Sequence, residues 1–309
     1  MRVAVQGMRA AQRVEAAEHK AQELYFAQVE VEEFESTIAA LTSVHRECST
    51  GINWPALTTH QPAIDRSESL RLQAQIASFQ PTFWERLWKD SKRPDQLVAA
   101  FQVAEENERV AWERAVVESN EIRHAAAAVL SGNTEFYNRV VADTECLAEL
   151  EEFGCQHRGG WVDPQTAWTS MRVGGPEVVP AVSKSLTRSG KLSTKKLPAN
   201  QQMEIYQDFV CGVALRVARE LCAVLPLQNV YCDVRAPVFD SRTGTTPDLL
   251  VLSVLCPAEV TNEGSTNFAR VDASDLVSSF RHEMKLTRGK GFLPVQSIMP
   301  VKALTSHHD

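Results

Sequence analysis

The chain has 309 residues, of which 44% are hydrophobic, and its 32 Lys and Arg residues stand against 39 Asp and Glu residues. This composition is typical of a globular protein and excludes collagen-like, mucin-like and disordered chains. No apolar run approaches the roughly 18 residues that a membrane span needs, and the first residues lack the apolar core of a signal peptide. The net charge of −7 argues against a protein coated with nucleic acid.

The two halves of the chain differ in net charge. Residues 1–155 carry a net charge of −10, whereas residues 156–309 carry +3. We therefore predict two domains, an acidic helical hairpin domain over 1–155 and an α+β domain over 156–309.

Two long runs in the N-terminal half predict long helices, from about Met8 to Cys48 and from about Asp95 to Leu130. Neither run contains Pro or Gly, and good helix formers dominate both. Their apolar residues recur every three or four positions and form one stripe on each helix. The stripes consist of Val14, Ala17, Ala21, Leu24, Ala27, Val31, Phe34, Ile38 and Leu41, and of Leu97, Phe101, Ala104, Ala111, Ala115, Ile122, Ala125 and Val129. The matched lengths predict a long antiparallel coiled-coil hairpin, with Glu108 and Glu118 interrupting its seam.

The segment between the long helices, Ser49 to Arg93, is irregular at first and then amphipathic. Trp84 and Trp88 are spaced i, i+4, so they lie on one face of a helix at the hairpin tip. They either contact a partner or are buried as a cap of the hairpin's open end.

The C-terminal half alternates between strand and helix patterns. A helix from Thr134 to Phe153 precedes the boundary, and Trp168–Val173 predicts a strand. The strongest helix runs from Gln202 to Leu225, and two β-rich runs, Val230–Phe239 and Leu249–Cys256, flank a hairpin turn. A last helix is predicted from Asp272 to Leu286, with Ser274 as its N-cap. This order predicts a compact α+β domain with a small sheet and helices on one of its faces.

The seven cysteines form an odd count with no repeated spacing, which argues against a disulfide framework and favours a reducing cytoplasm. Four of them, Cys211, Cys222, Cys232 and Cys256, lie in apolar runs and are expected to be buried. The candidate zinc ligands are His45, Cys48, Cys155 and His157, a weak set because its two pairs are 107 residues apart. No cofactor is expected.

A metal-dependent nuclease is the enzymatic alternative. Asp248 opens an apolar strand, and Asp233 and Glu259 supply two more carboxylates for Mg²⁺. No Lys follows Glu259 in the way that such sites require. A nucleophile elbow, a Walker A loop and a dinucleotide-binding glycine motif are all missing, so the sequence favours a protein without enzymatic activity.

Basic residues form two clusters that contrast with the acidic half. One lies in the predicted loop 184–196, which has no acid, and the other near the C-terminus. They are candidates for binding phosphate or for contacting the acidic hairpin of a second copy, although a solvated loop is an equal reading. The residues are Lys184, Arg188, Lys191, Lys195 and Lys196, and Arg281, Lys285, Arg288 and Lys290.

Three stretches carry a resemblance: LTSVHRECSTGINW at 41–54, KSLTRSGKLSTKKLP at 184–198 with YQDFVCGVALRVARELCAVLP at 206–226, and RHEMKLTRGKGFLPV at 281–295. They resemble a family of uncharacterised bacterial proteins with a helical hairpin and a C-terminal α+β domain. The resemblance implies a bacterial cytoplasmic setting and carries over no activity, substrate or catalytic residue.

These observations predict a non-enzymatic interaction or scaffolding protein that associates with itself or with a protein partner and not with a membrane. The alternative is a nucleic-acid-binding protein, or a degenerate nuclease that uses Asp233, Asp248 and Glu259.

Overall fold

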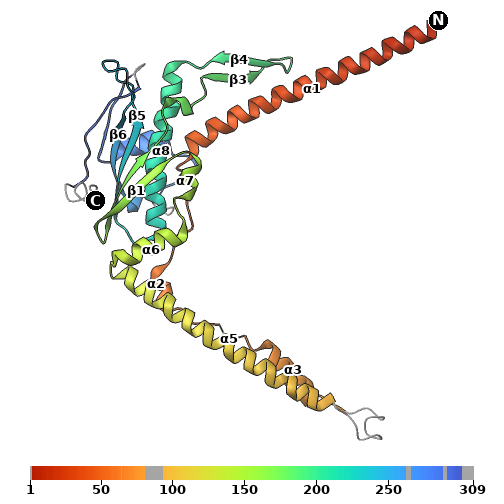
Figure 1. The fold of residues 1–309 in the computed structure, drawn as a ribbon, viewed down its shortest axis with the longest axis vertical. Helices are drawn as coiled ribbons and strands as arrows, with labels where there is room; N and C mark the ends of the chain where they lie inside the picture. Colours follow the sequence, from red (N-terminus) through yellow and green to blue (C-terminus); the bar gives the residue numbers. More distant parts are fainter. Residues whose placement is uncertain (1, 64, 81–92, 262–265, 288–290, 301–309) are drawn as a thin grey trace. The chain divides into compact units, whose positions relative to one another are not determined.

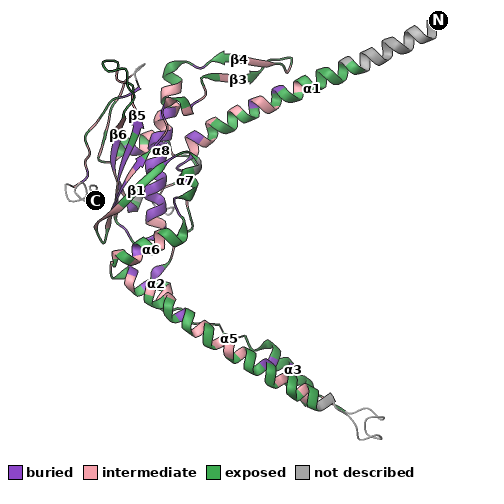
Figure 2. Ribbon diagram, in the orientation of Figure 1, coloured by how far each residue is buried: buried purple, intermediate pink, exposed green. Residues whose placement is uncertain are grey.

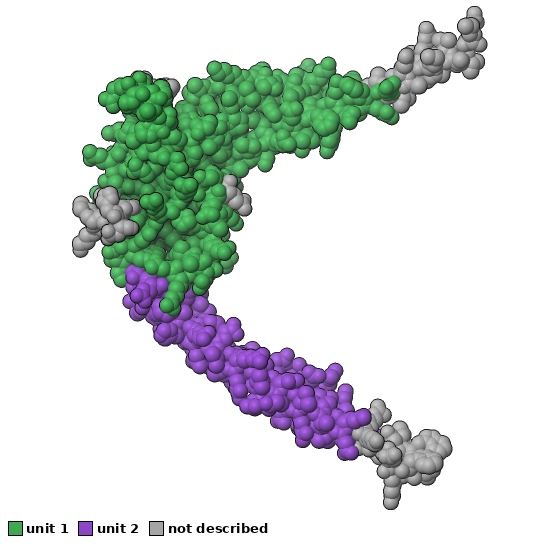
Figure 3. Space-filling view, in the orientation of Figure 1, with its two compact units in different colours: residues 1–52, 137–309 green, residues 53–136 purple. Residues whose placement is uncertain are grey.

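The computed structural model describes residues 2–63, 65–80, 93–261, 266–287 and 291–300. Its contacts divide the chain into two units, which Figure 3 colours separately. Unit 1 contains residues 1–52 and 137–309, and unit 2 contains residues 53–136. The boundary predicted at 155/156 therefore falls inside unit 1.

A mixed sheet forms the centre of unit 1. Its strands, in the order β1 (Gln156–Asp163), β2 (Thr166–Arg172), β5 (Asn229–Pro237), β6 (Asp248–Pro257) and β7 (His282–Met284), make five strands within the described residues. Only the pair β2 and β5 is parallel; the other neighbouring pairs are antiparallel. The α+β class predicted from sequence is therefore confirmed (Figure 1).

Helix α8 (Ala199–Val224) packs on one face of this sheet and connects the two parallel strands, as a parallel pair requires a long crossover. Every residue from Phe209 to Leu221 is buried (Figure 2). Alternate residues of β5 and β6 face the helix. Cys232 on β5 contacts the Ala214 carbonyl of α8 through its sulfur at 3.5 Å.

The opposite face of the sheet is partly covered by the C-terminal segment. The Ile298 amide donates to Ser253 Oγ on β6 at 3.0 Å. Met299 is buried against Trp168 on β2, and Tyr231 packs beside them.

The prediction of a loop at 184–196 is wrong, because residues 182–196 form a β-hairpin. Strands β3 (Val182–Leu186) and β4 (Leu192–Lys196) pair antiparallel. The period-2 spacing of Val182, Lys184 and Leu186 fits a strand, and Gly190 adopts a φ of +79° in the turn. We call residues 182–196 the basic hairpin.

Helix α1 (Arg2–Ser43) lies in unit 1 and packs on α8, β3 and β4. Ala27, Val31 and Leu41 of its predicted stripe are buried. The C-terminal part of the stripe is therefore covered within unit 1, whereas Ala17 and Ala21 are exposed.

Unit 2 consists of α2 (Trp54–Leu57), α3 (Ser67–Ala77) and α5 (Arg93–Leu130), with the start of α6. Helix α5 packs on α3 and α2, and Ala104 and Val129 of its predicted stripe are buried. Glu108, which interrupts the predicted seam, accepts a hydrogen bond from the Ser69 amide in the first turn of α3 at 2.8 Å.

The predicted helix at 134–153 is broken into α6 (Thr134–Thr144) and α7 (Ala148–Glu152). Between them Glu145 has a positive φ of 47°, which a continuous helix does not allow.

The predicted helix at 272–286 is too long. Helix α10 (Ala273–Ser279) ends early because the following residues join the sheet edge as β7. Asp272, not Ser274, caps α10: its carboxylate accepts from the Asp275 amide at 3.0 Å.

The remaining described elements are short. They are the 3-10 helix η1 (Pro176–Val178), helix α9 (Ala258–Thr261) and the paired strands β8 (Leu286–Thr287) and β9 (Gly291–Phe292).

Candidate interaction surface

The basic hairpin lies on the acidic helix α1, side by side along part of its length (Figure 1). The Lys184 ammonium is 3.1 Å from a carboxylate oxygen of Glu30. At the turn, a Cβ on Gly190 would lie 3.0 Å from Leu24. One of the predicted phosphate-binding cations is therefore engaged with α1 of the same chain.

A groove of about 340 Å³ opens between α1 and the hairpin. Its charged lining residues are Lys20, Glu23, Glu30 and Lys191, and its apolar lining residues are Leu24, Phe26, Ala27 and Leu192. On α1 these positions follow heptad spacing, so they form one face of the helix. We call this feature the α1 groove.

Two aromatic rings of α1 are exposed beside the α1 groove. Tyr25 is 65% exposed and Phe26 is 57% exposed, and their ring centroids are 6.0 Å apart. Towards the N-terminus, residues 15 and 17–23 are all exposed in the described chain (Figure 2). Tyr25 and Phe26 were not predicted as contact residues, although an aromatic pair beside the stripe position Leu24 is a signal in the sequence.

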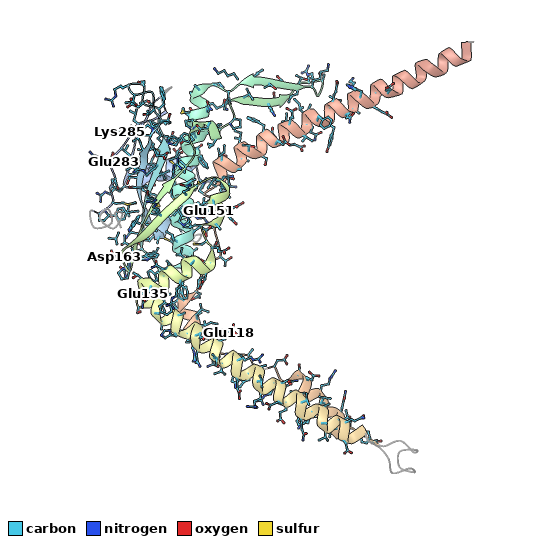
Figure 4. All side chains as sticks on the ribbon, viewed as in Figure 1. Glu118, Glu135, Glu151, Asp163, Glu283 and Lys285 are labelled. Carbon is cyan, nitrogen blue, oxygen red and sulfur yellow. The ribbon has the colours of Figure 1, made fainter. Side chains whose placement is uncertain are left out.

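The other cations of the basic hairpin, Arg188, Lys191, Lys195 and Lys196, are exposed. The second predicted cluster is only partly described. Arg281 and Lys285 are exposed at the two ends of β7, and Figure 4 shows Lys285 beside the sheet rather than on the hairpin. Arg288 and Lys290 lie outside the described residues, as do Trp84 and Trp88.

A buried ionic cluster fixes the end of α1 to α8. Arg219 on α8 donates to the carbonyls of His45, Arg46 and Glu47, at 3.0 Å for Arg46 and 3.2 Å for Glu47. Carbonyl groups at the C-terminal end of a helix have no hydrogen-bond donor within the helix. The neighbouring Glu220 carboxylate accepts from the Ser49 amide at 3.1 Å.

Three further contacts complete this cluster. Arg216 lies 2.6 Å from Glu220 and 2.6 Å from Glu149. The guanidinium of Arg219 stands 3.7 Å above the Phe268 ring, within the range of a cation–π contact. The two sequence stretches 41–54 and 206–226 thus meet at a rigid junction between α1 and α8.

The candidate zinc ligands are not assembled. His45 is buried and its Nε2 lies 3.0 Å from the Val271 carbonyl. Burial raises the pKa of the Cys155 thiol to about 11, which disfavours the thiolate that zinc binds. His157 is exposed on β1, and Cys48 is partly exposed. No group of three His, Cys, Asp or Glu side chains in the described part of the chain is placed to hold a metal.

The three nuclease carboxylates are also apart. Asp248 begins β6 and pairs with Arg172 at 2.7 Å, whereas Glu259 lies beyond the other end of β6. At roughly 3.3 Å per residue, the length of β6 separates them by about 30 Å. Asp233 is buried at mid-strand, where it accepts a hydrogen bond from Ser253.

Comparison with known proteins identifies no relative. No protein-family model, no curated protein and no solved structure matches the chain. Among the described residues, none of the helices combines the length and the apolar character needed to cross a bilayer.

Proposed function

We propose that this protein is a non-enzymatic interaction or scaffolding protein that associates with itself through α1. The supporting observation is that α1 continues beyond the basic hairpin with residues 15 and 17–23 exposed, next to the open α1 groove. Isolated helical segments of this length are only marginally stable in water. A partner that covers this stretch would therefore stabilise it.

The proposed partner is a second copy, with the two α1 helices antiparallel about a two-fold axis between residues 21 and 22. Lys20 of one copy would then face Glu23 of the other, and the symmetry forms this pair twice. Phe26, which lines the α1 groove on the same side of the helix as Glu23, would flank this contact. This pair of α1 helices from two copies differs from the hairpin that the sequence predicts within one chain, between the helices at 8–48 and 95–130.

Charge supports this arrangement. Residues 15–43 contain seven acidic residues and one Lys, whereas the basic hairpin has five cations and no acid. In an antiparallel pair, Lys191 beside the α1 groove would approach Glu18 of the second copy. Such complementarity favours the correct partner and accelerates association.

A charge exchange tests the arrangement. Lys20→Glu or Glu23→Lys alone places like charges opposite each other twice, so we expect dimerisation to weaken about tenfold. The double variant Lys20→Glu/Glu23→Lys should restore it, because both proposed pairs re-form with reversed sign. The mass from light scattering across a concentration series is the measurement. A wild-type chain that stays monomeric throughout would overturn the proposal.

Phe26→Ala tests the apolar part of the contact. Removing the ring in both copies should weaken the dimer about tenfold or more, since burying a Phe side chain is worth roughly 1.5–3 kcal/mol. Phe153→Ala is the matched control, because Phe153 is also exposed and lies outside the α1 groove. Equal effects of the two changes would contradict a specific role for Phe26.

Nucleic-acid binding is the second candidate, because four hairpin cations are exposed and Phe26 lines the same groove as Lys191. Exposed rings beside cations suit single strands. Glu23 and Glu30 in that groove oppose a polyanion, so we rank this candidate second. Salt-dependent binding to DNA or RNA, lost in Lys191→Glu/Lys195→Glu/Lys196→Glu, would support it. Mg²⁺-dependent cleavage lost in Asp248→Ala would instead support the nuclease alternative.

We also propose a bacterial cytoplasmic setting and kinship with the family that the sequence resembles. The seven cysteines, all within the described residues, form no disulfide, which supports a reducing compartment. Labelling of free thiols in the protein isolated from its native cells, before and after reduction, tests the compartment.

A further inference from the structure

A second cavity lies in unit 1, outside the α1 groove. It forms where the parallel strands β2 and β5 end, beside the second turn of α8, and has a volume of about 230 Å³. In sheets with parallel strands this edge is a common place for ligands. Its lining includes Pro176, Glu177, Tyr206, Pro237, Phe239 and Phe292, which we call the aromatic cavity.

The aromatic rings that line the aromatic cavity have differently oriented ring planes. Tyr206 and Phe292 have ring centroids 5.6 Å apart and planes at 71° to each other. Both are buried, and the Tyr206 hydroxyl is fixed by donating to the Gly174 carbonyl at 2.7 Å. Phe239 is 67% exposed. Two rigid rings and one accessible ring therefore surround the space.

The aromatic cavity carries negative charge. Glu177 is the charged side chain among its described lining residues, and its carboxylate is held by the Gly175 amide at 3.1 Å. Burial raises the pKa of Tyr206, and the nearby negative charge of Glu177 raises it further. The carboxylate is thus close enough for its field to act on this ring.

We propose that the aromatic cavity binds a methylated ammonium group, carried by a small cation such as choline or by a methylated lysine side chain. The negative faces of aromatic rings attract cations, and rings arranged around a quaternary ammonium are its usual recognition site. Glu177 supplies the compensating charge. An anion would be repelled, and a neutral apolar ligand would desolvate the carboxylate without compensation.

The test compares choline with 3,3-dimethylbutan-1-ol, in which a carbon atom replaces the charged nitrogen and the shape is kept. Calorimetric titration of the full chain should give at least about tenfold tighter binding of choline. Equal binding of the two, or no choline binding at millimolar concentration, would overturn the proposal. An Nα-acetyl trimethyllysine amide distinguishes the sources: tighter binding than choline favours a methylated lysine, and weaker binding favours a small cation.

Variants assign the binding to this cavity. Phe239→Ala and Glu177→Gln should each weaken choline binding severalfold, whereas Phe239→Trp should retain it, because the aromatic face remains. Phe153→Ala, which removes an exposed ring elsewhere, should leave it unchanged. Because Phe239 and Glu177 are exposed, the fold should survive these changes, and circular dichroism checks this. Unchanged binding in both Phe239→Ala and Glu177→Gln would overturn the assignment.

Discussion

At the residue scale, the buried side chain of Arg219 on α8 binds the end of α1. Its guanidinium donates hydrogen bonds to three carbonyls at the end of α1 and also stacks on the ring of Phe268. Arg219→Met keeps the apolar stem but leaves those carbonyls without this donor. We expect a loss of about 3 kcal/mol in the free energy of unfolding, measured with denaturant. Arg242→Met, at an exposed turn, is the control and should stay within about 0.5 kcal/mol.

His45 makes the stability depend on pH. Burial lowers its pKa below 6.5, helped by the positive charges of Arg46 and Arg219 and opposed by the Val271 hydrogen bond and by Asp272. Because the unfolded chain binds this proton more readily, stability should fall as the pH drops below about 6.5. His45→Gln should show a smaller fall between pH 7.5 and 5.5 in urea unfolding. An identical fall in the variant would contradict this role.

Asp208 has the opposite dependence. Burial and the neighbouring Asp272 raise its pKa to about 6. The folded state therefore holds this proton more tightly than the unfolded state, and stability should decrease as the pH rises from about 4 through 6. Asp208→Asn should remove that decrease from denaturant titrations. If the variant followed the wild-type profile above pH 5, Asp208 would not be the titrating group.

The junction between α1 and α8 shows a limit of prediction from sequence. The charged residues of RVARE at 216–220 interrupt an apolar helix, and the i, i+4 spacing of Arg216 and Glu220 predicts their ion pair, but nothing local identifies the other partners. Those partners, such as Ser49 and Glu149, lie 67 or more residues away.

At the element scale, the basic hairpin can be tested through its turn. Gly190 and Gly244 both have positive φ, at 79° and 68°, but only Gly190 has a side chain of α1 close to its Cβ position. Ala at either position should cost about 1 kcal/mol through backbone strain. Gly190→Ala should cost more, because Leu24 must move. Denaturant unfolding of the two variants gives the difference, and equal losses would argue against close contact with α1.

Element types were predictable where periodicity was strong and long. The two long helices, α8 and the hairpin of β5 and β6 agree with the sequence within a few residues, apart from the two ends of α1. Strand β1 was missed because Gly159 and Gly160 indicate a boundary. Those glycines instead allow close approach of β2: a Cβ on Gly160 would lie 3.0 Å from the Trp168 ring nitrogen.

The candidate surface was only partly predictable. The cations of the basic hairpin and the apolar stripe of α1 could be identified from the sequence. The packing of the hairpin on α1 could not. That contact depends on chain topology, because α1 and the hairpin are more than 130 residues apart. The aromatic cavity also depends on chain topology, because its rings come from α8, from the segment after β5 and from β9.

At the scale of the whole molecule, the charge asymmetry of the sequence does not follow the spatial units. Residues 1–52 are acidic, yet they belong to unit 1 with the C-terminal half. The reason is the α1–α8 junction, which joins distant parts of the chain. Composition along the sequence can therefore identify differently built halves without showing which segments share a core.

The two units should also differ in local stability. In unit 1, α8 and the central strands are buried, whereas in unit 2 the helix α5 leaves Val103 and Val117 exposed. Local opening is easiest where little apolar surface is buried. Hydrogen exchange of the full chain should therefore be slowest in α8, β5 and β6 and faster in α3 and α5. Equal protection of α5 and α8 would contradict this difference.

The same exchange experiment connects to self-association. If residues 15–26 of α1 are covered by a second copy, their amides should become more protected as protein concentration rises, while α8 stays constant. In Phe26→Ala the rise in protection should shift to about tenfold higher protein concentration or beyond, because the weaker dimer leaves this stretch of helix exposed. Protection that does not vary with concentration in the wild-type chain would mean that α1 is stabilised without a second copy.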